Sequence, residues 1–212
     1  MAEPALARKT LIRLALEHCR PGGGSPREFL LERTWEMQVP DLRPILDPFP
    51  WAIVGAVAAR FYMPERSTRG VDIAIWHEDA AAVRKCLRAA GFSYHDELPI
   101  GGSSWYTPDG LPLDVVELRD DWARQALEGA RGNRDPQGLP ILPLPYLVLM
   151  KFSAGRLQDM ADLSRMLGQA TEPELDRVRA LFSRFRADDT QDLESLIHLG
   201  RLEFQDPASP AH

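Results

Sequence analysis

The chain has 212 residues, 44% of them hydrophobic and 26% charged, with a formal net charge of −6 at pH 7. This length and composition are typical of a soluble globular protein with one large domain, or with a core and a small helical addition. The acidic balance excludes a globally basic surface for duplex DNA but is compatible with a local basic pocket for nucleotides. No apolar run of the sequence is long enough to span a bilayer, and Cys19 and Cys86 fit no metal or disulfide pattern, so we expect a cytoplasmic protein.

The N-terminal part, residues 1–49, is predicted to be a helical segment. Apolar residues recur at helical spacing over residues 5–19, and a second helix is predicted over residues 27–37. Prolines at positions 40, 44, 48 and 50 then predict a turn-rich entry to the next part of the chain.

Residues 50–142 carry the pattern of a mixed α/β core. Strands are predicted over residues 51–54, 71–76, 92–95, 104–107, 111–118 and 140–142, and helices over residues 56–62, 79–90 and 120–130. Pro108-Asp109-Gly110 is a strong turn signal and predicts a hairpin between two of these strands.

The C-terminal part, residues 143–205, is predicted to be helical. Helices are expected from Leu144 onwards and over residues 156–168, 172–187 and 190–200, and residues 206–212 are expected to be a disordered tail. On the second of these helices, an apolar face is predicted from Leu157, Met160, Leu163 and Leu167. The whole pattern predicts an α+β fold, in which a mixed sheet is flanked by helices and followed by a helical C-terminal part.

The segment from Gly55 to Ile75 combines residues that phosphate chemistry needs. A predicted strand ends at Gly55, and the helix that follows offers free N–H groups and the positive end of its dipole to an anion. Arg66 and Thr68 lie on the loop into the next strand, and Asp72 lies at the start of that strand among apolar residues. This arrangement predicts a phosphate cradle beside a carboxylate that holds Mg²⁺.

The same segment resembles the first motif of the polymerase-beta-type nucleotidyltransferases, above all the small bacterial ones, which include toxin-like members of abortive-infection systems. In that family, a Gly-Gly or Gly-Ser turn precedes Arg-x-Thr-x-Asp-x-Asp. The matching positions here are Gly55 and Ala56 for the turn, Arg66 and Thr68 for their counterparts, Asp72 for the second aspartate, and Gly70 in place of the first.

The resemblance also implies a third metal-binding carboxylate on a nearby strand, and Asp114 in Leu113-Asp114-Val115-Val116-Glu117 matches it. Because side chains alternate along a strand, Glu117 is expected on the other face of the sheet and does not replace Asp114. Asp72 and Asp114 are therefore the implied metal ligands. The loss of a ligand at Gly70 is expected to weaken Mg²⁺ binding.

A second stretch, residues 139–163, resembles the part that follows the core in the same family, where a Lys, an Arg and Asp-x-x-Asp-Leu recur on helices facing the nucleotide. The resemblance implies that Lys151 neutralises phosphate charge and that Asp159 orients a substrate hydroxyl or the lysine. Arg156, Asp159 and Asp162 are spaced three residues apart, which places them on one face of a helix.

Taken together, the resemblance implies a Mg²⁺-dependent nucleotidyltransferase that moves a nucleoside monophosphate from an NTP to a hydroxyl of a protein, a tRNA or a small antibiotic. The implied catalytic residues are Asp72, Asp114 and Lys151, and the implied nucleotide-binding residues are Gly55, Ala56, Arg66, Thr68, Lys151, Arg156 and Asp159. Gly70 supports an alternative, in which a catalytically degenerate fold serves as a nucleotide-binding or regulatory module, or as the toxin–antitoxin partner of another protein.

Simpler structural explanations exist for each of these residues. Gly55 is also what a plain strand-to-helix turn requires, Asp72 and Asp114 also suit the ends of strands, and Arg66 with Thr68 also suits a solvated loop. The charged residues from Lys151 to Asp162 also fit an ordinary salt-bridged helix face. Ser103 and Ser104 follow Gly101-Gly102, and this pattern predicts a flexible loop.

Overall fold

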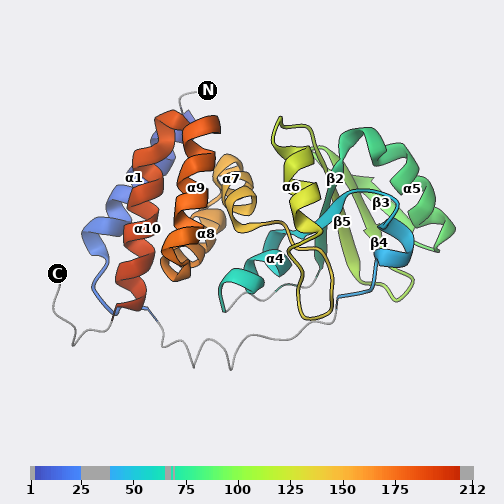
Figure 1. Ribbon diagram of the computed structural model, residues 1–212, viewed down its shortest axis with the longest axis horizontal. Helices are drawn as coiled ribbons and strands as arrows, with labels where there is room; N and C mark the ends of the chain where they lie inside the picture. The colour runs from blue at the N-terminus through green and yellow to red at the C-terminus, as the bar shows by residue number, and fades with distance from the viewer. Residues whose placement is uncertain (1–2, 25–38, 65–67, 69, 206–212) are drawn as a thin grey trace. The chain divides into compact units, whose positions relative to one another are not determined.

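The computed structural model describes residues 3–24, 39–64, 68 and 70–205, and these residues form an α+β fold (Figure 1). A mixed five-stranded sheet is flanked by helices, which confirms the predicted fold class. The helix predicted over residues 27–37 and the tail predicted from residue 206 lie outside the described residues.

The chain divides into two compact units. The sheet unit contains residues 35–61 and 66–143, and the helical unit contains residues 1–34, 62–65 and 144–212. The helical unit therefore combines the N-terminal helix with the C-terminal helices.

The sheet unit is built on strands β1 (Trp51–Val54), β2 (Val71–Trp76), β3 (Ser93–Glu97), β4 (Gly102–Tyr106) and β5 (Pro112–Leu118). Their spatial order is β1-β2-β5-β4-β3. Among these described strands, β2 and β5 run parallel, and the other three neighbouring pairs are antiparallel. The hairpin between β4 and β5 is the one that the turn at residues 108–110 predicted. Beside the edge strand β1, Ile141 makes an isolated bridge to Ile53, where a short strand over residues 140–142 was predicted.

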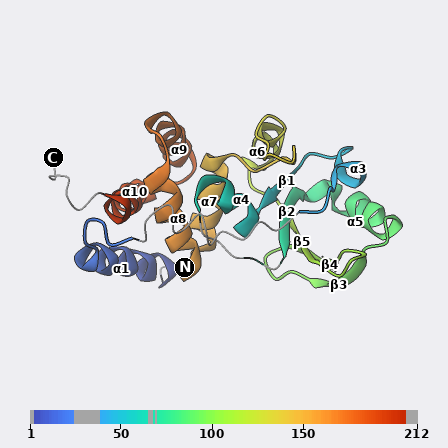
Figure 2. The same cartoon turned by 90° about the horizontal axis from the view of Figure 1, so that it is seen from below.

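The helices of the sheet unit are α3 (Arg43–Leu46), α4 (Gly55–Tyr62), the 3-10 turn η1 (His77–Asp79), α5 (Ala80–Ala89) and α6 (Ala123–Ala130). α3 was not predicted, because its four residues lie within the proline-rich entry, where Pro44 is tolerated in the first turn. Figure 2 shows α4 and α5 on opposite sides of the sheet.

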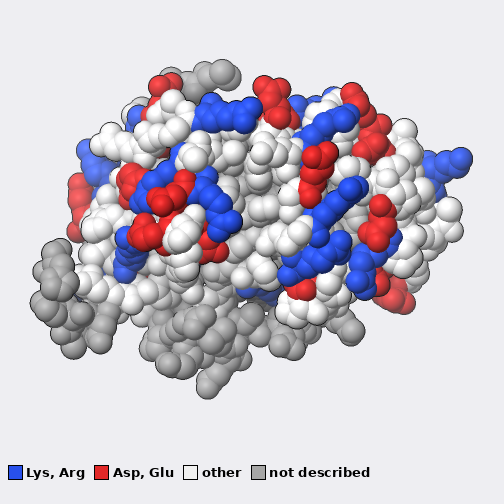
Figure 3. All heavy atoms as spheres, viewed as in Figure 1, with Lys and Arg blue, Asp and Glu red and all other residues white. Residues whose placement is uncertain are grey.

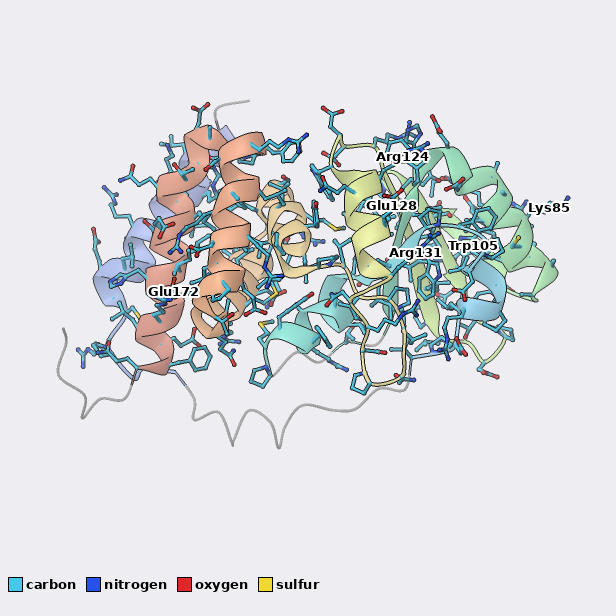
Figure 4. The ribbon with its side chains drawn as sticks, viewed as in Figure 1. Lys85, Trp105, Arg124, Glu128, Arg131 and Glu172 are labelled. Atoms are coloured by element: carbon cyan, nitrogen blue, oxygen red, sulfur yellow. The ribbon has the colours of Figure 1, made fainter. Side chains whose placement is uncertain are left out.

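One face of the sheet is covered by α5. Arg84 of this helix donates to Glu117 Oε1 at 2.9 Å, and the Arg88 guanidinium lies 5.7 Å from the centre of the Trp105 ring. Figure 4 shows Trp105 on the sheet side of α5 and Lys85 on its outer side. Trp105 is completely buried, as are the neighbouring apolar residues Ile73, Ile75 and Leu113. Part of the core of the sheet unit therefore lies on this face, while the opposite face carries the buried residues Ala74, Val116 and Leu118 as well as polar residues.

The helical unit consists of α1 (Glu3–His18), α7 (Leu144–Ala154), α8 (Leu157–Gln169), α9 (Glu172–Phe185), the 3-10 turn η2 (Ala187–Asp189) and α10 (Thr190–Phe204). α7 ends before Gly155, whose φ of 65° is a left-handed conformation that favours glycine. α1 is held to α10 by Arg8, which donates to Asp192 Oδ2 at 3.0 Å and also pairs with Asp189.

The predicted apolar face of α8 is correct at Met160, Leu163 and Leu167, which are buried, and wrong at Leu157, whose exposed fraction is 70%. Leu157 is the first residue of α8, so its side chain precedes the turns that pack in the unit. None of the described helices combines the length and apolarity needed to cross a bilayer.

Candidate functional site

Asp72 and Asp114 are adjacent on the face of the sheet opposite α5. The parallel register of β2 and β5 pairs their Cα atoms directly, between the pairs Val71 with Leu113 and Ile73 with Val115. Neighbouring strands lie about 4.8 Å apart, and side chains at paired positions point to the same face. Both aspartates are half-buried, while the residues beside them in each strand are fully buried. The two implied metal ligands are thus brought together by the central strand pair.

Gly55 lies against the first of these carboxylates. Its φ is +63°, and a Cβ added there would lie only 2.0 Å from Asp72 Oδ2. Val54, the last residue of β1, is the antiparallel partner of Asp72. Gly55, which follows Val54, therefore lies next to the Asp72 carboxylate. Gly55 is the first residue of α4 and Ala56 the second, so the N-terminal N–H groups of this helix belong to the same site. A glycine is required here both by backbone conformation and by space.

Thr68 and Gly70 form a small turn before β2. The Thr68 hydroxyl donates to Gly70 O at 3.1 Å, which fixes the chain two residues before Asp72. At Gly70 a Cβ would lie 3.1 Å from Pro112 O and 3.2 Å from Pro112 Cβ, a tight but not prohibitive fit. Arg66, the remaining residue of the implied motif, lies outside the described residues.

Glu117 is separated from the aspartate pair, as its position in the strand predicted. It lies on the α5 face and accepts from Arg84, which also donates to Glu97 Oε1 at 2.6 Å. The hydrogen bond from Arg84 lowers the pKa of the Glu97 carboxyl below its ordinary value. Glu97 and Glu117 thus form ion pairs with Arg84 and join α5 to the sheet.

The glycines before Ser103 and Ser104 predicted a flexible loop, which is wrong because both serines belong to β4, whereas the strand predicted from residue 104 correctly included Ser104. The two preceding glycines misled the prediction: Gly102 is itself a strand residue, and an added Cβ there would lie 2.0 Å from Val115 O. The register pairs Ser104 with Asp114. Alternation along β4 places Ser103 and Ser104 on opposite faces of the sheet. That Ser104 pairs with Asp114 depends on the register between β4 and β5, which cannot be read from the sequence.

The charged residues of the second implied stretch form a cluster inside the helical unit. Lys151 Nζ on α7 donates to Asp162 Oδ2 at 2.7 Å and to Asp159 Oδ1 at 3.2 Å, both on α8. All three are nearly completely buried, whereas the Arg156 side chain, which donates to Asp159 Oδ2 at 2.7 Å, is 74% exposed. Asp159 thus accepts hydrogen bonds from both Lys151 and Arg156.

The donor set of the sheet unit suits a hard divalent cation that keeps several waters. Mg²⁺ is commonly bound through one or two carboxylates together with substrate phosphates, and the aspartate pair supplies two. Among the described residues, no group of three or more His, Cys, Asp and Glu is arranged to hold a metal ion. The pair therefore fits Mg²⁺ best when a nucleotide provides the remaining oxygen ligands.

The surface of the sheet unit carries charges of both signs. In Figure 3, Lys and Arg side chains are interspersed with Asp and Glu side chains on the visible face. Figure 4 shows Arg124, Glu128 and Arg131 in succession along α6, and Arg124 donates to Glu78 Oε2 at 3.0 Å. This face is therefore mixed in charge.

Comparison of the sequence with models of protein families finds no match, and comparison with curated proteins also finds none. Among solved structures, the chain is similar to a crystal structure of ANT(2")-Ia in complex with adenylyl-2"-tobramycin, with 14% identity, a TM-score of 0.39, and coverage of 72% of this chain and 88% of that one. It is also similar to a solution structure of the antibiotic-resistance factor ANT(2'')-Ia, with 16% identity, a TM-score of 0.41, and coverage of 72% and 83%. At this identity and TM-score, the similarity assigns no role to any residue.

Proposed function

We propose that this protein is a nucleotidyltransferase, which moves a nucleoside monophosphate from an NTP to a hydroxyl group of an acceptor. The observation that supports this most is the direct pairing of Asp72 with Asp114 beside Gly55 at the start of α4. In the transfer, the acceptor oxygen bonds to the α-phosphorus and the bond to pyrophosphate breaks. Proteins, tRNAs and small molecules are all compatible acceptors.

The two aspartates would hold Mg²⁺, which when bound supplies charge stabilisation to the phosphates and to the attacking oxygen. Their placement on adjacent strands of the sheet gives them a rigid frame, since both flanking residues in each strand are buried. Rigid placement matters because misplacing reacting groups by about 1 Å can reduce the rate 100-fold.

The phosphates would lie at the N-terminus of α4, where Gly55 and Ala56 offer backbone N–H groups and no bulky side chain. Thr68 and Arg66 would support the turn and the phosphate charge. In the helical unit, the family resemblance alone assigns Lys151 and Arg156 to phosphate charge, and Asp159 accepts a hydrogen bond from Lys151.

Titration calorimetry with each of the four common NTPs and Mg²⁺ is the direct test, followed by transfer of label from α-³²P-NTP in cell extract. We expect heat with at least one NTP and labelling that Asp114→Asn abolishes. An absence of heat with all four nucleotides contradicts nucleotide binding and removes the basis for the proposed transfer.

Gly70 supports a second candidate, a nucleotide-binding or regulatory module, such as a toxin–antitoxin partner, that has lost catalysis. A Cβ at this position would lie 3.1 Å from Pro112 O, a tight but not prohibitive fit, so an aspartate can be restored there. The two candidates differ in the behaviour of Gly70→Asp. If the wild-type protein binds an NTP without transferring it and Gly70→Asp labels an acceptor, the natural protein is the degenerate module.

A further inference from the structure

We propose that Ser104 is a positioning residue of the aspartate site, where its hydroxyl supplies an oxygen next to Asp114. This inference rests on the proposed function, because it concerns the same metal and nucleotide site. It adds a residue that the motif does not contain.

The register of three strands forms a polar row across the sheet. Asp72 on β2 is paired with Asp114 on β5, Asp114 with Ser104 on β4, and Ser104 with Asp96 on the edge strand β3. Paired residues point to the same face, and the Cα atoms of an antiparallel pair are about 4.5–5.5 Å apart. The Ser104 side chain therefore stands beside the Asp114 carboxylate on the aspartate face.

The two serines of β4 differ in what their hydroxyls contact. Ser103 points to the opposite face, is completely buried, and accepts a hydrogen bond from Trp105 Nε1 at 2.9 Å. Ser104 is half-buried, and its hydroxyl has no hydrogen-bond partner among the described residues. One hydroxyl thus holds a core tryptophan, while the other is left available on the aspartate side.

A hydroxyl at this place compensates for the missing ligand at Gly70. Mg²⁺ requires six oxygen ligands, and serine or threonine hydroxyls serve as ligands in other phosphoryl-transfer sites. A hydroxyl can also accept a hydrogen bond from a metal-bound water and orient it, and loss of such a partner typically weakens metal binding about 10- to 100-fold. Either contact increases the affinity of a two-carboxylate site without adding a negative charge.

The test measures Mn²⁺ binding by electron paramagnetic resonance on the full chain, without an activity assay. We expect Ser104→Ala to weaken Mn²⁺ affinity about tenfold and Ser104→Thr, which keeps the hydroxyl, to bind as the wild type does. Ser93→Ala on β3 is the matched control and is expected to leave affinity unchanged. Ser103→Ala is expected to lower the melting temperature but not the Mn²⁺ affinity.

The outcomes separate this inference from the proposed function. If Asp114→Asn weakens Mn²⁺ binding and Ser104→Ala does not, the role of Ser104 is wrong while the aspartate site stands. If Asp114→Asn binds Mn²⁺ as the wild type does, the aspartate site itself is wrong. Equal losses in Ser104→Ala and Ser104→Thr would also overturn the inference, since they would reflect packing and not the hydroxyl.

Discussion

Asp72 and Asp114 are direct Cα partners in the parallel register of β2 and β5, so that two carboxylates stand side by side on one face of the sheet. Like charges directly opposite each other in a sheet are destabilising. A cation bound between the two carboxylates would offset this repulsion, so its binding would stabilise the fold. A stability measurement can detect this even before the acceptor is known.

The first prediction concerns Asp114→Asn, which removes one of the two charges and keeps the shape of the side chain. In EDTA, we expect the melting temperature to change by no more than about 4 °C, because a cross-strand pair contributes up to about 1 kcal/mol. In Mg²⁺ with an NTP, we expect the wild-type protein to gain stability through binding and the variant to gain little. Thermal unfolding followed by circular dichroism in both buffers measures this. Asp121→Asn, at an exposed position, is the control, and equal ligand stabilisation of Asp114→Asn and the wild type would contradict the prediction.

The second prediction concerns the glycine beside Asp72. Gly55→Ala forces a Cβ into the left-handed region and to within 2.0 Å of Asp72 Oδ2, so either the carboxylate or the start of α4 must move. We expect a loss of about 2–4 kcal/mol in the free energy of unfolding, from backbone strain and overpacking together, and loss of nucleotide binding. Urea unfolding and calorimetry with an NTP measure the two effects.

Gly110→Ala is the matched control for that variant. Gly110 has a φ of +82°, and an added Cβ would meet nothing within 4 Å. It therefore isolates the strain of a left-handed alanine, about 1 kcal/mol, without a clash. Equal destabilisation by the two substitutions would show that contact with Asp72 plays no part at Gly55.

The sequence predicted the elements of the sheet unit well, because their signals are local. The run Trp51–Val54 and the turn at residues 108–110 each specify structure within a few residues. Even the exclusion of Glu117 followed from alternation within one strand. The register between β5 and β4 follows from long-range packing instead, so the proximity of Ser104 to Asp114 could not be predicted.

The buried cluster around Lys151 was predictable in composition but not in environment. Three-residue spacing placed Asp159 and Asp162 on one face of α8, and that spacing suits an exposed salt-bridged face as well as a buried one. Which face packs inward depends on α7, whose lysine is the buried partner of both aspartates. The distinction changes the expected loss of stability on mutation. Removing one partner of a buried ion pair leaves an uncompensated buried charge, which destabilises the fold more than the loss of an exposed pair.

A third prediction concerns the missing aspartate. Gly70→Asp adds a carboxylate two residues before Asp72, just ahead of β2, and we expect Mn²⁺ affinity to rise about tenfold as ligand charge increases. Crowding against Pro112 is expected to reduce the free energy of unfolding by about 1 kcal/mol. Calorimetry with Mn²⁺ and urea unfolding give the two values. Gly70→Ala shares the crowding without the charge, so a similar rise in affinity with alanine would show that the carboxylate is not the cause.

The last prediction tests whether Lys151 acts on phosphate or only supports the helical unit. Lys151→Met leaves two buried carboxylates without their lysine, and removing one partner of a buried ion pair typically costs about 3–5 kcal/mol. Arg156→Gln, at a largely exposed side chain, is expected to change the free energy of unfolding by less than about 1 kcal/mol. Urea unfolding distinguishes the two, and a loss below 1 kcal/mol in Lys151→Met would mean that the cluster is not needed for folding.

Replacing the whole cluster separates folding from function. The combination of Lys151→Met, Asp159→Asn and Asp162→Asn removes the unpaired charges along with the lysine, so we expect most of the lost stability to return. This folded variant can then be titrated with an NTP and Mg²⁺. If Lys151 carries phosphate charge, the affinity falls at least tenfold, in line with the loss of a charge-assisted hydrogen bond of about 1.5–3 kcal/mol. If the affinity is that of the wild type, the lysine and its two aspartates only join α7 to α8, and the phosphates are neutralised by other residues.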